Sequence, residues 1–81
     1  MSYKAIITRE SDRPLYVDLT SQEYKSTITK MAKLGFRLST ALVYEKTAII
    51  YIKGRKKSEE LKEKLTEELS KWGKVDYRSS V

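Results

Sequence analysis

The chain has 81 residues and a formal net charge of +6, and it contains no histidine, cysteine or asparagine. Histidine and cysteine supply most of the acid–base, nucleophilic and zinc-binding chemistry that enzymes use near neutral pH, so their absence argues against an enzyme. A chain of this length forms one small core, and we expect a single domain over residues 1–81.

Composition also bears on location and stability. Charged residues make up 35% of the chain, a share typical of hyperthermophile proteins. The longest uninterrupted apolar run is Ala48–Ile52, far shorter than a membrane-spanning helix, and Met1–Arg9 lacks the apolar stretch of a signal peptide. We therefore expect a cytoplasmic protein without a membrane partner, stabilised by packing, ion pairs or self-association.

The N-terminal part predicts two strands. Tyr3–Arg9 and Leu15–Leu19 are rich in β-favouring residues, and Glu10–Pro14 between them is typical of a turn. Within Leu15–Leu19 aliphatic residues alternate with Tyr16 and Asp18, which indicates a half-buried strand.

A helix should follow. Thr20 and Glu23 have the spacing of a capping box, and Gly35 before Phe36 is a typical stop signal. The predicted apolar stripe of this helix consists of Tyr24, Ile28, Met31 and Ala32.

The stretch Phe36–Lys53 predicts a β-hairpin that turns near Glu45–Lys46. The face beneath the helices should carry Phe36, Leu38, Thr40, Leu42, Tyr44, Ala48, Ile50 and Ile52. The opposite face should carry Ala41, Val43, Ile49 and Tyr51, with Tyr16 joining them if its strand pairs in that register. This second face is apolar, which predicts an interface with a partner chain unless the C-terminal tail or the N-terminal strand covers it.

A second helix should begin after Ser58 and stop at Gly73. Its stripe consists of Leu61, Leu65, Leu69 and Trp72. Val75 and Tyr77 then alternate with charged residues, which suggests a short edge strand.

This order of elements predicts an α+β fold, with an antiparallel sheet and two helices on one face. It corresponds to the ferredoxin-like βαββαβ order with an extra N-terminal strand. The alternative is a ββαββ sheet from which the C-terminal helix projects to swap or dimerise.

Two resemblances add to these expectations. A helix ending in Leu34-Gly35-Phe36, followed by Arg37-Leu38 and a hairpin ending in Tyr51-Ile52-Lys53-Gly54-Arg55, resembles small uncharacterised ββαββ domains of bacteria and archaea. The composition resembles that of small accessory proteins of crenarchaeal viruses and plasmids. The second resemblance implies an accessory role in a host cytoplasm, and neither implies a catalytic motif.

The strongest candidate binding feature is the basic block formed by Lys53, Arg55, Lys56 and Lys57, with Tyr51 two residues before it. Such a loop can contact nucleic-acid phosphates, and an aromatic beside it can stack unpaired bases. A merely solvated loop, ordinary interface packing of Tyr51 and an acidic protein partner are the alternatives. The glycines at 35, 54 and 73 form no nucleotide-binding motif, and the sequence suggests no metal or cofactor.

These patterns together predict a non-enzymatic, homo-oligomeric binding protein, most simply a homodimer, that contacts nucleic acid through the basic loop. The alternative is a protein–protein interaction module, an inhibitor or adaptor, that uses the apolar sheet face. DNA and RNA are not distinguished.

Overall fold

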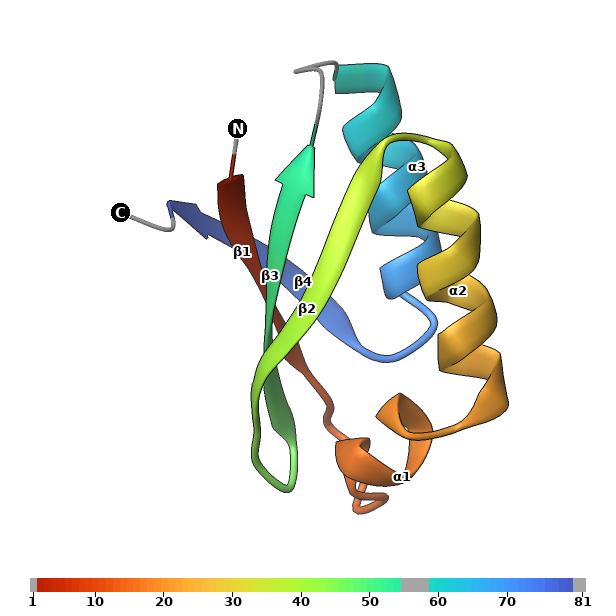
Figure 1. Ribbon diagram of the computed structural model, residues 1–81. Helices are drawn as coiled ribbons and strands as arrows, with labels where there is room; N and C mark the ends of the chain where they lie inside the picture. Colours follow the sequence, from red (N-terminus) through yellow and green to blue (C-terminus); the bar gives the residue numbers. More distant parts are fainter. Residues whose placement is uncertain (1, 55–58, 80–81) are drawn as a thin grey trace.

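The computed structural model describes residues 2–54 and 59–79. Its elements are β1 (Ser2–Thr8), α1 (Leu15–Leu19), α2 (Gln22–Lys33), β2 (Phe36–Val43), β3 (Thr47–Gly54), α3 (Glu59–Leu69) and β4 (Lys74–Ser79). The strands form one antiparallel sheet in the order β2-β3-β1-β4, and α2 and α3 cover one face of it (Figure 1). The predicted α+β class is therefore confirmed.

The core lies between the sheet and these two helices. The two central strands contribute Ala5, Ile7, Ala48, Ile50 and Ile52, all fully buried. Leu65 and Leu69 of α3 are also fully buried, so the alternative in which the last helix projects from the fold is wrong. Among the described residues, no helix combines the length and the apolar character needed to cross a membrane.

The predicted strand at Leu15–Leu19 is wrong, because this segment forms the short helix α1. Leu15 and Leu19 are four residues apart, so a single helical turn buries both while Val17 stays 41% exposed. The backbone amide of Leu15 donates to the carbonyl of Glu45 at 2.8 Å. Helix α1 thus closes the end of the core beside the hairpin turn.

Helix α2 begins one residue later than the predicted capping box requires. Ser21 is the N-cap, and its hydroxyl oxygen accepts a hydrogen bond from the amide of Tyr24 at 3.3 Å. The Thr20 hydroxyl instead donates to the carbonyl of Tyr16 at 2.7 Å. Thr27 is buried although the predicted stripe does not include it, and Ala32 is exposed although the stripe includes it. The predicted stop at Gly35 is confirmed by its φ of 95°, which favours glycine.

A β-bulge in β2 changes which side chains face the core. The register shifts between Thr40 and Leu42, so Ala41 is the extra residue, and Val43 then lies opposite the buried Ala48. Val43 packs against the core, whereas Leu42 is 41% exposed. The predicted faces of Leu42 and Val43 are therefore wrong. Tyr44, predicted on the core face, follows the strand and is 64% exposed.

Candidate nucleic-acid interface

The sheet face opposite the helices is called the open face here. No described helix covers it (Figure 1). Because side chains alternate along a strand, its members are those between the buried positions of each strand. They are Lys4, Ile6 and Thr8 of β1, Arg37, Ser39 and Leu42 of β2, Thr47, Ile49, Tyr51 and Lys53 of β3, and Lys74, Asp76 and Arg78 of β4.

Positive charge dominates this face. Five of its side chains are cationic and only Asp76 is anionic. Arg37 lies directly opposite Lys53 on neighbouring strands, and Lys4 lies directly opposite Arg78. Like charges in directly opposite positions destabilise a sheet. None of these four cations forms an ion pair within the described part of the chain.

Tyr51 adjoins both like-charged pairs. It faces Ser39 on one side and Lys4 on the other, and the Arg37–Lys53 pair is the next position along the same face. The side chain is 45% exposed. An exposed ring bordered by cations can stack an unpaired base while the cations contact the flanking phosphates.

An apolar strip crosses the same face beside Tyr51. Leu42 pairs with Ile49, which pairs in turn with Ile6, and the row ends at Asp76. Ile49 and Ile6 are half-buried and Leu42 is exposed. The open face therefore has a basic part around Tyr51 and an apolar strip next to it.

The basic part continues around one end of the sheet. A hollow there is lined by Ala32, Lys33, Gly35, Phe36, Arg37, Lys53 and Gly54. Lys33, Arg37 and Lys53 line it together, and no carboxylate of the described residues does, so this lining is electropositive. It connects the C-terminal end of α2 to the open face.

The predicted site residues are only partly brought together. Tyr51, Lys53 and Ile49 share the open face, and Ala41 is the bulge residue beside it. Val43 is on the core side, and Tyr16 lies on α1, where it is 56% exposed. The remaining members of the predicted basic loop, Arg55, Lys56 and Lys57, lie outside the described residues.

Pairing of β4 with β1 adds cations that the predicted site does not include. Lys74 and Arg78 reach the open face from β4, and Lys4 reaches it from the adjacent β1. Alternation within each strand is visible in the sequence, but the pairing that brings the strands together is not.

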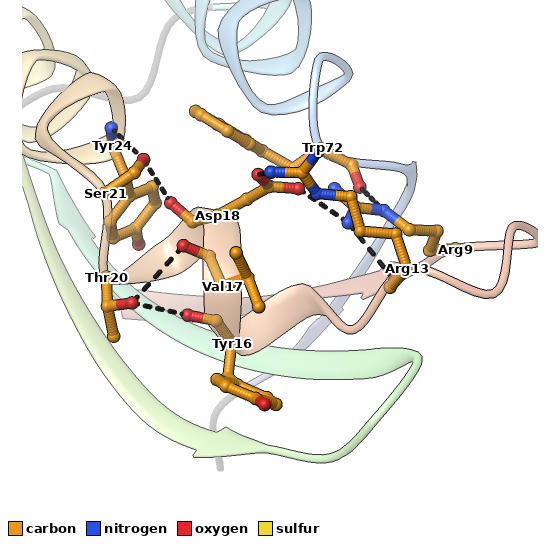
Figure 2. Close-up of polar contacts among 9 residues, drawn as sticks. All are labelled: Arg9, Arg13, Tyr16, Val17, Asp18, Thr20, Ser21, Tyr24 and Trp72. Atoms are coloured by element: carbon orange, nitrogen blue, oxygen red, sulfur yellow. Dashed lines mark hydrogen bonds and ion pairs between the residues drawn. The ribbon is translucent and has the colours of Figure 1, made fainter.

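A second polar cluster holds α1 in place (Figure 2). One carboxylate oxygen of Asp18 lies 2.6 Å from Nη1 of Arg9, and the other lies 2.9 Å from Nη2 of Arg13. Nε of Arg9 also donates to the carbonyl of Trp72 at 3.1 Å. Arginines therefore occupy both oxygens of Asp18, and the cluster ties α1 to the residues that follow β1 and precede β4.

The tyrosines on the helix side have a different environment from Tyr51. The rings of Tyr3 and Tyr77 meet edge to face at 5.5 Å, and Nζ of Lys62 lies 4.7 Å from the centre of the Tyr77 ring. Burial, together with the neighbouring Tyr77, raises the pKa of Tyr3 to about 12. Burial also raises the pKa of Tyr77, against the opposing effect of its 2.6 Å hydrogen bond with Thr66.

Among the described residues, no group of three or more His, Cys, Asp or Glu side chains is placed to hold a metal ion. Comparison with protein-family models, with curated proteins and with solved structures finds no match to this chain.

Proposed function

We propose that the protein is a non-enzymatic binding protein that holds single-stranded nucleic acid on the open face. The observation that carries the proposal is that two like-charged pairs, Arg37 with Lys53 and Lys4 with Arg78, both adjoin the exposed Tyr51. Phosphates would contact the cations and a base would stack on the ring. The sequence continues from Lys53 into Arg55, Lys56 and Lys57, which adds charge to the same segment.

The charge arrangement is unfavourable for the protein alone. Each directly opposed like-charged pair lowers the stability of the fold by about 0.2–1 kcal/mol. A bound polyanion offsets this repulsion, because its phosphates attract both cations. Some surface cations elsewhere have carboxylate partners, as Lys30 and Lys71 do with Glu68. A face that keeps opposed cations without such partners is what a polyanion-binding surface requires.

We infer in addition that the fold is a ferredoxin-like variant in which α1 is inserted between β1 and α2. The strand order β2-β3-β1-β4 and the two helices on one face support this assignment. In such an arrangement the uncovered sheet face is the natural binding platform.

Fluorescence anisotropy with labelled single- and double-stranded DNA and RNA, at two salt concentrations, tests the proposal. The variant Arg37→Gln/Lys53→Gln removes two open-face charges, and Lys25→Gln/Lys64→Gln removes two exposed charges from the helices as a matched control. We expect the face variant to weaken binding and to lower the slope of log affinity against log salt by about 1.5, with no change in the control. Tyr51→Ala should weaken binding to single strands more than to duplexes.

Equal losses in the face variant and the helix control would mean undirected charge attraction, and would overturn the assignment to the open face. The absence of any binding at low salt would remove nucleic acid as the ligand.

The apolar strip favours a second candidate, a protein partner on the same face. The bulge at Ala41 turns Leu42 toward Ile49 and Ile6, which gives the strip an exposed end. Ile49→Lys would then abolish binding of the partner protein, whereas Arg37→Gln/Lys53→Gln would leave it intact. The opposite pattern supports nucleic acid.

A further inference from the structure

The two edges of the sheet differ in how well they are protected against another strand. The edge strand β2 carries the bulge at Ala41, which interrupts regular pairing. The other edge strand, β4, pairs with β1 in unbroken register from Thr8–Lys74 to Tyr3–Ser79. No described strand pairs with its outer side. Regular edges of this kind are templates for pairing with another chain.

Helix α3 leaves this edge accessible. An open groove between α3 and β4 is lined by Lys62, Glu63, Thr66, Glu67, Ser70 and Tyr77. The Tyr77 hydroxyl is hydrogen-bonded to Thr66 on α3, which holds the ring toward its own helix. The side chain therefore does not extend across the outer edge of the strand.

Geometry limits how two copies of β4 can pair. Directly opposed residues of antiparallel strands point to the same face, so two copies keep their helices on one side only if the two-fold axis passes beside a residue rather than between two. Two such registers overlap most of the strand. In one the axis passes beside Asp76, and in the other beside Tyr77.

Charge separates these two registers. With the axis at Asp76, Asp76 faces the partner's Asp76 and Lys74 faces the partner's Arg78, so every charged contact is repulsive. With the axis at Tyr77, Asp76 faces the partner's Arg78 and Arg78 faces the partner's Asp76. Both of these contacts are attractive. Asp76 and Arg78 are exposed on the open face, so they can form these contacts without any rearrangement of the core.

We propose that two copies of this chain pair antiparallel through β4, with the two-fold axis at Tyr77 and reciprocal Asp76–Arg78 ion pairs. The two sheets then form one continuous sheet, and the two open faces lie side by side. This inference does not rest on nucleic-acid binding, because it follows from the edge and its charges alone. If the protein both dimerises in this way and binds nucleic acid on the open face, the dimer presents a binding surface twice as long as that of one chain.

A charge-swap experiment tests the pairing. Sedimentation equilibrium should show a dimer for the unaltered chain. Asp76→Arg and Arg78→Asp should each raise its dissociation constant about tenfold or more, because two attractive contacts become repulsive. The double variant Asp76→Arg/Arg78→Asp restores complementary charges and should return the dissociation constant to near its original value.

The substituted side chains, Asp76 and Arg78, are exposed, and circular dichroism with thermal unfolding checks that each variant still folds. Ile49→Lys, on the open face, serves as the control and should leave the dimer intact. A monomeric unaltered chain, failure of the double variant to recover, or loss of the dimer in Ile49→Lys would overturn the proposal. Nucleic-acid binding of Arg37→Gln/Lys53→Gln reports separately on the open face, because these two changes lie on β2 and β3 and leave β4 unaltered.

Discussion

The two faces of the sheet are built from the same strands but differ in what they contribute. The helix side carries fully buried aliphatic residues such as Ile7, Ile50 and Ile52, and its Tyr77 hydroxyl is hydrogen-bonded to Thr66. The open face carries opposed cations and an exposed Tyr51. The first arrangement stabilises the fold, and the second costs stability. Strand alternation lets a small domain separate these two tasks within one sheet.

The largest expected effect compares neighbours on β3. Ile50→Ala should lower the free energy of unfolding by about 2–5 kcal/mol, because it leaves a cavity in the core. Ile49→Ala, at a half-buried position on the open face, should lower the free energy of unfolding by less than half as much. Urea denaturation of both variants measures the difference, and equal losses would contradict the distinction between the faces.

The bulge predicts the next largest effect, on adjacent residues of β2. Val43→Lys should destabilise the fold by about 1–3 kcal/mol, because the ammonium group would be placed against the core. Leu42→Lys should change stability by only about 0.5 kcal/mol, because that side chain is already exposed. A regular strand without the bulge would give the reverse order, so thermal unfolding of the two variants decides whether Ala41 is the extra residue.

Alkaline pH should lower the stability of the fold, because it ionises Tyr3 on the helix side of the sheet. In the unfolded chain this hydroxyl ionises near its ordinary pKa of 10.0, whereas in the folded protein its pKa is about 12. Its contribution to stability is complete below pH 10 and is lost as the pH rises toward 12. The melting temperature should therefore fall over this range, and fall less steeply for Tyr3→Phe. Parallel curves for the two proteins would show that Tyr3 is not responsible.

The smallest effect concerns the open face, and its sign is the informative part. Lys53→Gln should stabilise the protein by about 0.2–1 kcal/mol at low salt, because it removes the repulsion from Arg37. The same change should weaken nucleic-acid binding. Lys25→Gln on α2 should do neither. Thermal unfolding at low and high salt checks this, since added salt should reduce the stability gained.

Much of the fold could be predicted because its signals are local. The hairpin turn at Glu45–Lys46, the helix stop at Gly35 and the edge strand after Gly73 are all where the sequence indicates. The error at Leu15–Leu19 has a physical cause. In five residues, leucines at both ends fit a strand period and a helical i,i+4 spacing equally well. A strand would also place Val17 on the face of the leucines, and only the tertiary structure shows that Val17 is exposed while both leucines are buried.

The candidate site was less predictable than the fold. Tyr51 and Lys53 stand out in the sequence because they adjoin a basic block, and both lie on the open face. Lys4 reaches the same surface only because β1 pairs with β3, and Arg78 reaches it only because β4 pairs with β1. The prediction that Tyr16 joins this face depends on a paired strand at Leu15–Leu19, and it is wrong because this segment forms α1.

The amino-acid sequence is enough to predict the class of the protein: an α+β domain with a strong positive charge and without histidine or cysteine. These properties depend on composition and short-range spacing. Which side chains share a surface depends on the strand order β2-β3-β1-β4 and on the bulge at Ala41, both of which are properties of the folded chain. Strand pairing joins residues far apart in the chain, and one extra residue reverses the face of those that follow it, so no local pattern specifies either.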